Sequence, residues 1–175
     1  MPIGRQAYWQ LSGFYFFYFA LLGCVAPYWG LYLDHLGYSA YSIGILLGVW
    51  ALSKVVAPNL WAWLARHKLS ALVVCRVGAS FSIISFLPVF FSPGFYFLAL
   101  AIFLYSFFWN AILPQFEVIT LNLLGENKAY YSRIRLWGSL GFICSVVGLG
   151  FFFEHFSLNY LPWIMLLLLI FILLN

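Results

Sequence analysis

The segment 109–142, WNAILPQFEVITLNLLGENKAYYSRIRLWGSLGF, joins two long apolar stretches through a short polar turn, GENK, at 125–128. Glu117 lies about two helical turns before this polar turn, and Arg135 lies about two helical turns after it. With a rise of about 1.5 Å per helical residue, both charges are roughly 10 Å from the turn. The segment therefore predicts two antiparallel helices that carry a carboxylate and a guanidinium at similar depth.

This spacing allows two interpretations of Glu117 and Arg135. Charged side chains inside a membrane span are energetically unfavourable, so they usually face a bundle interior or a water-filled cavity, and they usually pair. The pair is therefore a candidate for substrate binding or proton coupling. The alternative is a structural salt bridge that only holds two helices together.

The composition of the chain is that of an integral membrane protein. Of its 175 residues, 66% are hydrophobic and 7% are charged, and the mean hydropathy is +1.02. Soluble domains carry about 25% charged residues. The net charge of +4 does not indicate nucleic-acid binding, because the Lys and Arg residues lie mainly in short loops and near helix ends rather than in a basic stripe.

Six apolar runs divide the chain, and each is close to the length of a membrane span. They cover 8–33, 42–65, 69–92, 95–123, 129–153 and 158–174. A spanning helix needs about 20 apolar residues, so the last run is only just long enough. The pattern predicts an all-α membrane protein, with a single domain over 1–175 that is a bundle of six transmembrane helices.

Polar residues within these runs are the candidate site residues. Asn110, Pro114 and Glu117 are spaced i, i+4, i+7, so they share one helix face. Lys54 lies about midway along the second run, where it would suit an organic anion. The alternative for Lys54 is a lysine satisfied by helix carbonyls or water.

Small residues and cysteines in the runs are expected to serve packing. Gly44 and Gly48 in the second run have the small-xxx-small spacing that lets helices approach closely. The fifth run has a stripe of small residues with the same expected role: Gly138, Gly141, Ser145 and Gly148. The three cysteines are predicted to be inert core residues rather than disulfides or metal ligands: Cys24, Cys75 and Cys144.

The positive charges of the loops lie on one side of the predicted bundle. Cytoplasmic loops of membrane proteins are enriched in Lys and Arg. The amino end, the second turn and the fourth turn carry Arg5, Arg66, Lys68 and Lys128. The other turns carry none, so both termini are predicted to be cytoplasmic. Arg76 and Arg133 lie within two turns of the same side, where their side chains are expected to reach lipid phosphates.

Three stretches carry a resemblance to a known family. They are PYWGLYLDHLGYSAYSIGILLG at 27–48, SKVVAPNLWAWLA at 53–65 and SRIRLWGSLGF at 132–142. The chain resembles the amino-terminal half of a major facilitator superfamily transporter, in the branch of proton symporters related to the lactose permease and the 3-phenylpropionate transporter. This resemblance implies one half of a twelve-helix fold, in which two six-helix halves enclose a central cavity. It also implies a location in the bacterial inner membrane.

The resemblance implies roles for individual residues. Glu117 and Arg135 match, by position and separation, a charged pair at the substrate site of the lactose-permease relatives. Lys54 matches a lysine of the phenylpropionate-like branch. Substrate binding or proton coupling is therefore expected to involve Glu117, Arg135, Lys54 and Asn110.

One family motif is lost. The superfamily signature between helices two and three is Gly-x-x-x-Asp-x-x-Gly-Arg-Lys, and the corresponding run here is AWLARHKLSA. Its five defining positions are occupied instead by Ala62, Arg66, Leu69, Ser70 and Ala71. The switching role of this turn in the family is therefore not expected here, although the turn stays basic.

These features lead to two hypotheses for function. The first is a half of a secondary active transporter that carries a small organic solute, such as a sugar or an aromatic or organic acid, with protons. The alternative is a truncated bundle that does not transport and acts only by associating with a partner half. Asn175 falls where the sixth helix is predicted to finish, so the opposing cavity wall would come from a carboxy-terminal half or from self-association. No paired-Asp, Ser/His or metal-ligand arrangement in the runs indicates an enzyme or a cofactor.

Overall fold

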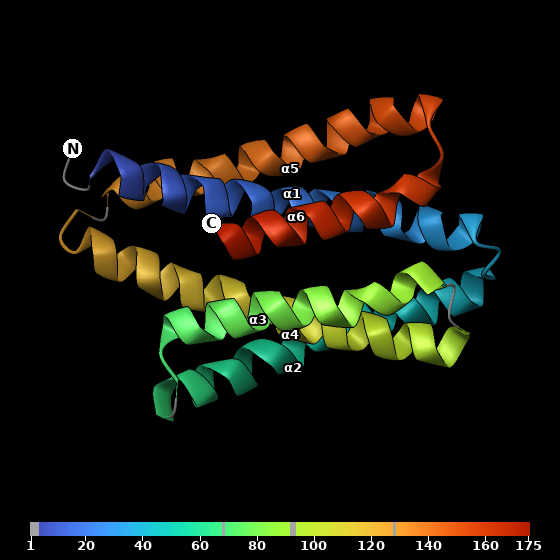
Figure 1. The fold of residues 1–175 in the computed structure, drawn as a ribbon, viewed down its shortest axis with the longest axis horizontal. Coiled ribbons are helices and arrows are strands. Elements are labelled where there is room, and N and C mark those ends of the chain that lie inside the picture. The colour runs from blue at the N-terminus through green and yellow to red at the C-terminus, as the bar shows by residue number, and fades with distance from the viewer. Residues whose placement is uncertain (1–3, 68, 92–93, 128) are drawn as a thin grey trace. The chain divides into compact units, whose positions relative to one another are not determined.

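The computed structural model describes residues 4–67, 69–91, 94–127 and 129–175, and these residues form helices and no strands. This confirms the predicted all-α class. The elements in chain order are α1 (Arg5–His35), α2 (Ala40–His67), α3 (Ala71–Phe86), η1 (Leu87–Phe91), α4 (Phe95–Leu124), α5 (Ala129–His155), η2 (Leu158–Tyr160) and α6 (Leu161–Leu174) (Figure 1).

Five of the helical segments in the described residues are long and apolar enough to cross a membrane. The segment Leu158–Leu174 is shorter. At about 1.5 Å per residue, α6 is roughly 21 Å long, against a hydrocarbon core of about 30 Å. A sixth full span therefore remains a prediction.

Local interactions at the helix ends explain why the helices begin and end where they do. Ser70 caps the start of α3, because its hydroxyl accepts a hydrogen bond from the Val73 backbone N–H at 3.4 Å. Ser39 precedes α2 and accepts a bond from the Ser42 backbone N–H in the same way. Gly125 follows α4 with a φ of 53°, the left-handed conformation that commonly ends a helix.

The contacts divide the chain into two compact units. Unit 1 contains Met1–His35 and Thr120–Asn175, and unit 2 contains Leu36–Ile119. The single domain over 1–175 remains a prediction.

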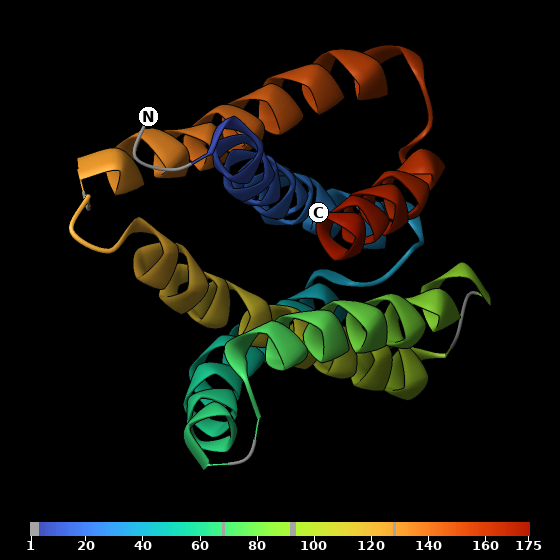
Figure 2. The ribbon, with the colours of Figure 1, turned by 60° about the vertical axis from the view of Figure 1, so that its left-hand side comes forward.

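In unit 1, α1 packs against both α5 and α6 (Figure 2). The indole N–H of Trp137 donates to the Tyr8 hydroxyl at 3.2 Å, and the Tyr28 hydroxyl donates to the Val146 carbonyl at 2.6 Å. Contacts that advance together along both helices show that α1 and α5 run parallel. If each successive long helix crosses the membrane once, the first and the fifth helix must run in the same direction, as they do here.

Glycines of α5 allow α1 to approach closely. A methyl group on Gly141 would overlap the Phe16 backbone, and one on Gly138 would lie 2.8 Å from the Phe19 ring. Ser145 also lies at this contact, with its oxygen 3.3 Å from the Cys24 sulfur. Gly148 differs from the prediction, because nothing lies within 4 Å of a methyl group added there. The expected stripe therefore holds for three of its four members.

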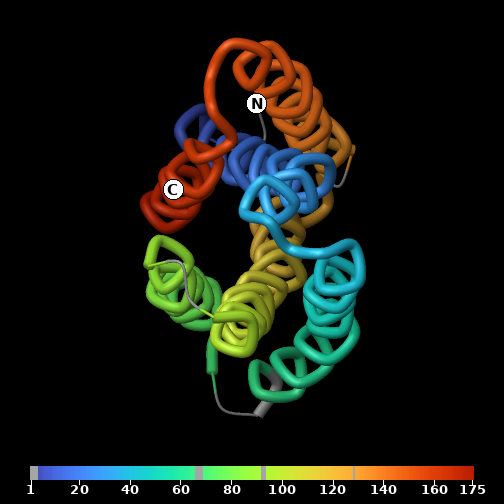
Figure 3. Tube along the Cα trace, turned by 90° about the vertical axis from the view of Figure 1, so that its right-hand side faces the viewer, coloured from blue at the N-terminus to red at the C-terminus, as the bar shows by residue number. Residues whose placement is uncertain are grey.

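In unit 2, α3 and the first part of α4 run side by side in opposite directions (Figure 3). The Cys75 thiol lies 3.6 Å from the Ile112 carbonyl, and the Ser82 hydroxyl lies 3.5 Å from the Tyr105 carbonyl. A buried cluster joins α2, α3 and α4, and it consists of Ala57, Trp61, Val74 and Ala111.

Two packing predictions are wrong within the described residues. Nothing in unit 2 lies within 4 Å of a methyl group on Gly44 or Gly48, so the helices of this unit do not approach closely there. Cys144 is exposed rather than in the core, whereas Cys24 and Cys75 are buried as predicted. All three cysteines are free thiols.

Part of the predicted charge pattern cannot be placed. Lys68 and Lys128 lie outside the described residues, as do the side chains of Arg66 and His67. Arg5 is exposed at the start of α1.

Candidate functional site

Lys54 lies on α2 and stacks on its own helix. Its ammonium nitrogen is 3.4 Å from the centre of the Trp50 ring, one turn earlier, and the side chain is exposed. A cation over an indole face is stabilised by the negative face of the ring system. The charge of Lys54 is therefore held at mid-helix beside an aromatic surface.

Asn110 joins α4 to α2. Its side-chain amide donates to the Ser53 hydroxyl at 3.2 Å and to the Ser106 carbonyl at 2.7 Å. The Ser53 hydroxyl in turn donates to the Trp50 carbonyl at 2.7 Å. Both amide protons of Asn110 are thus used in helix packing, which leaves its carbonyl oxygen as the atom suited to a ligand.

Prolines place an extra acceptor at each of these two positions. Proline has no N–H, so it cannot donate to the carbonyl four residues earlier in a helix. Pro58 lies inside α2 four residues after Lys54, and Pro114 lies inside α4 four residues after Asn110. The backbone carbonyls of Lys54 and Asn110 therefore lack their usual helical donors, so each position combines a polar side chain with an available backbone acceptor.

Glu117 is half-buried on α4, two turns beyond Asn110 on the same face. Pro114 lies between them on that face. Asn110 and Glu117 both belong to unit 2, as does Lys54.

Arg135 lies two turns into α5, in unit 1, and its guanidinium rests on aromatic rings of α1. The guanidinium carbon is 4.1 Å from the centre of the Phe19 ring and 5.3 Å from that of Tyr15. Tyr15 is itself buried, and its hydroxyl donates to the Thr120 hydroxyl at 3.4 Å. Stacking on these rings holds the plane of the guanidinium in place.

The predicted pair is divided between the two units. Glu117 lies in unit 2 and Arg135 in unit 1. Their approach across α4 and α5 stays a prediction, as does the grouping of Lys54 and Asn110 with them.

The structure adds Ser53 and Trp50 to the candidate residues. Ser53 is fully buried, at 0% exposure, and the Trp50 indole N–H is also buried, with no hydrogen-bond acceptor in the described part of the chain. Two sequence signals point here: Ser53 directly precedes Lys54, and Trp50 lies one turn before it. Neither signal says which residue of another helix Ser53 would meet.

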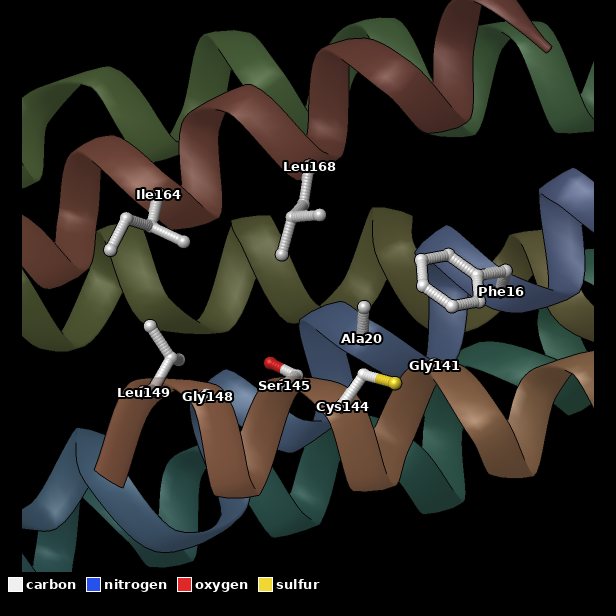
Figure 4. Close-up of a pocket in the computed structure, with 9 residues that line it drawn as sticks. All are labelled: Phe16, Ala20, Gly141, Cys144, Ser145, Gly148, Leu149, Ile164 and Leu168. Atoms are coloured by element: carbon white, nitrogen blue, oxygen red, sulfur yellow. The ribbon is translucent and has the colours of Figure 1, made fainter. Parts of the chain in front are cut away.

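A cavity of about 270 Å³ in unit 1 is a poor candidate for a polar substrate. It lies between α1, α5 and α6 (Figure 4), and its polar side chains are Cys144 and Ser145. The other lining residues are Phe16, Ala20, Gly141, Gly148, Leu149, Ile164 and Leu168. In a helix of 3.6 residues per turn, Cys144 points to the side of α5 opposite Arg135. Among the described residues, no group of three His, Cys, Asp or Glu side chains is placed to hold a metal ion.

Known proteins with similar sequences are transporters. The model of the MFS_1 like family matches residues 8–175. The chain is 28% identical over 149 residues to YwbF, an uncharacterised transporter of Bacillus subtilis, and 28% identical over 155 residues to the maltose permease of Geobacillus stearothermophilus. It is 26% identical over 141 residues to a probable 3-phenylpropionic acid transporter of Escherichia coli.

These matches cover most of this chain but a smaller share of each relative. The three alignments include 83%, 82% and 77% of the chain, and 37%, 37% and 35% of the relatives. A crystal structure of the nucleoside transporter NupG is similar with a TM-score of 0.78 and 26% identity, over 95% of this chain and 43% of that chain. The chain thus spans less than half the length of each transporter compared.

Proposed function

Because this chain belongs to the MFS_1 like family of membrane transporters, we propose that it forms one half of a secondary active transporter that moves a small organic solute together with protons. The family match confirms the resemblance predicted from the sequence. Proton coupling, the class of solute and the site residues are the proposed steps beyond family membership.

The observation that carries the proposal is the presence of three ionisable side chains well inside long apolar helices. Lys54, Glu117 and Arg135 each lie at least about two turns from the nearest helix end. Each such charge costs a few kcal/mol or more inside a membrane, and residues of this kind mark substrate and ion pathways. A purely structural bundle would not need three of them.

Each proposed residue has a chemical role. Glu117 takes up and releases the coupled proton, because a carboxyl can exist in both protonation states inside a cavity. Arg135, held flat on Phe19, binds a carboxylate of the solute through two parallel N–H bonds, or a hydroxyl through a single bond. Lys54 adds a second positive charge, and Asn110 offers its two carbonyl oxygens as acceptors.

The relatives suggest which solutes to test. The names of these relatives refer to maltose, 3-phenylpropionic acid and nucleosides, all of which are small and polar and include a sugar or an aromatic ring. Two cations among the proposed residues favour an organic acid, and the carboxylate favours a hydroxylated solute such as a sugar. We propose this range as the substrate class.

The test is uptake into vesicles with an imposed proton gradient. The 175-residue chain is reconstituted alone and together with the carboxy-terminal half of the maltose permease, and uptake of maltose, 3-phenylpropionate and a nucleoside is measured. Glu117→Gln should abolish uptake driven by the gradient, whereas Glu126→Gln, in the exposed turn after α4, is the matched control. Equal coupling in the two variants would remove Glu117 from the proposal.

The second candidate function is a bundle that does not transport and acts only by associating with a partner half. It rests on the match to only 35–37% of the curated relatives. Since the opposing cavity wall belongs to the other half in this fold, we expect no uptake by the chain alone. Saturable uptake by a monodisperse monomer would contradict this expectation, and absence of uptake in every combination would favour the second function.

A further inference from the structure

A groove of about 420 Å³ lies between the first turns of α1 and α5, within unit 1. It is lined by Tyr8, Ser132, Arg133, Leu136, Trp137 and Leu140. We propose that this groove binds one anionic phospholipid, with the headgroup phosphate at Arg133 and an acyl chain along Leu136 and Leu140.

The groove and Arg135 lie on nearly opposite sides of α5. Successive residues of an α-helix are about 100° apart, so Arg133 and Arg135 point to nearly opposite sides of α5. Arg135 rests on Phe19 and Tyr15, whereas Arg133 is exposed. The proposal is therefore independent of transport and requires only that the helices lie in a bilayer.

The polar end of the groove fits a phosphate. Arg133 stacks beside the Tyr130 ring, with its guanidinium carbon 5.4 Å from the ring centre, which leaves its N–H edges to bind an anion. The Ser132 hydroxyl is exposed beside it. The Tyr8 oxygen accepts the Trp137 indole N–H at 3.2 Å, so the phenolic O–H can donate to a third acceptor.

The rest of the groove fits an acyl chain. Leu136 is 60% exposed and Leu140 39%, one and two turns deeper along α5 than the polar end. Trp9, which is 50% exposed, stands against Trp137 with ring centres 5.4 Å apart, as expected for aromatic rings at the membrane boundary. The groove thus carries a cation and hydroxyls at one end, aromatic rings next to them and leucines beyond. This order from polar to apolar matches that of a phospholipid, from headgroup to acyl chain.

Cys144 offers a built-in probe for the test. It is exposed and lies one turn beyond Leu140 on the same face, whereas Cys24 and Cys75 are buried. The full chain is labelled at Cys144 with a fluorophore and placed in phosphatidylcholine vesicles. Quenching is then compared between phosphatidylglycerol and phosphatidylcholine that carry a spin label on the acyl chain.

We expect spin-labelled phosphatidylglycerol to quench at several-fold lower mole fraction than spin-labelled phosphatidylcholine. Arg133→Gln should remove roughly a fivefold preference, the effect of one basic residue near a membrane surface. Arg76→Gln removes the same charge from an exposed position on α3, in unit 2, that does not line the groove, and it should leave the preference unchanged.

Three results would overturn the proposal. Equal quenching by the two lipids would show that no anionic lipid is selected. Equal loss in Arg133→Gln and Arg76→Gln would show a general effect of net charge. Displacement by soluble glycerol phosphate would show a site for a free phosphate instead of a lipid.

Discussion

Gly141 is the residue at which α5 comes closest to α1. Gly141→Ala should destabilise the fold by about 1–3 kcal/mol, because the added methyl group overlaps the Phe16 backbone and the helices must separate. Gly148→Ala is the matched control on the same helix. Its methyl group meets nothing within 4 Å, so it should be neutral or stabilise by up to about 1 kcal/mol through helix propensity. The free energy of unfolding of each variant is measured in mixed micelles of mild detergent and dodecyl sulfate. Equal changes in the two variants would contradict the close contact at Gly141.

The Asn110 side chain links α4 to α2 through Ser53, so the contribution of this interhelical hydrogen bond to the free energy of unfolding can be measured separately. Asn110→Ala and Ser53→Ala should be coupled by about 0.6 kcal/mol in a double-mutant cycle, the average for hydrogen bonds between membrane helices. Asn59→Ala is the control, because the Asn59 amide donates to the Val55 carbonyl of its own helix. Additive effects of Asn110→Ala and Ser53→Ala would show that this hydrogen bond does not form in the bilayer.

At the scale of elements, the sequence predicts where helices occur but not how each one ends or what it contacts. Apolar runs near 20 residues must become helices in a membrane, because the backbone has to bond to itself there. The run predicted over 69–92, however, forms an α-helix only to Phe86 and then a 3₁₀ turn, Leu87–Phe91. Pro88 has no N–H to continue the α-helical pattern, and this proline was visible in the sequence.

The charged candidate residues can be singled out from the sequence, but their contacts and the added residue Ser53 cannot. Charge inside an apolar run singles out Lys54 and Arg135 whatever surrounds them. Which groups they contact depends on packing between segments far apart in the chain: Phe19, which lies on α1, supports Arg135 on α5. Ser53 illustrates the same limit, since serines are common in membrane helices and only its distance to Asn110 reveals its role.

The proline in α4 gives a prediction for that helix as a whole. Pro114→Ala supplies an N–H to the Asn110 carbonyl, so the infrared band of that carbonyl, labelled with ¹³C, should shift to lower wavenumber. Pro162→Ala is the control, because Pro162 lies in the first turn of α6, where no helical bond is missing. An unmoved band in Pro114→Ala would mean that another group already donates to the Asn110 carbonyl.

At the scale of the whole molecule, the testable property is orientation in the membrane. The loop charges predict cytoplasmic termini, which places the turn at 36–39, after α1, outside the cell. A cysteine introduced at Tyr38 should therefore react with an impermeant maleimide in intact cells, while one at Glu126 should react only after permeabilisation. Cys144→Ser in both variants removes the exposed native thiol. The reverse pattern would invert the topology and would place Arg133 on the outer leaflet.

The parallel contact between α1 and α5 also sets an order of events during synthesis. Cys24 and Ser145, which meet there, are 121 residues apart in the chain. A ribosome adds about 5–20 residues per second, so roughly 6 to 24 seconds pass between the emergence of the two residues. Throughout that interval, the face of α1 that carries Phe16, Phe19 and Gly23 has no helix to receive it. Lipid or the insertion machinery must shield this face until α5 arrives, and variants that weaken the contact would prolong the exposure to membrane quality-control proteases.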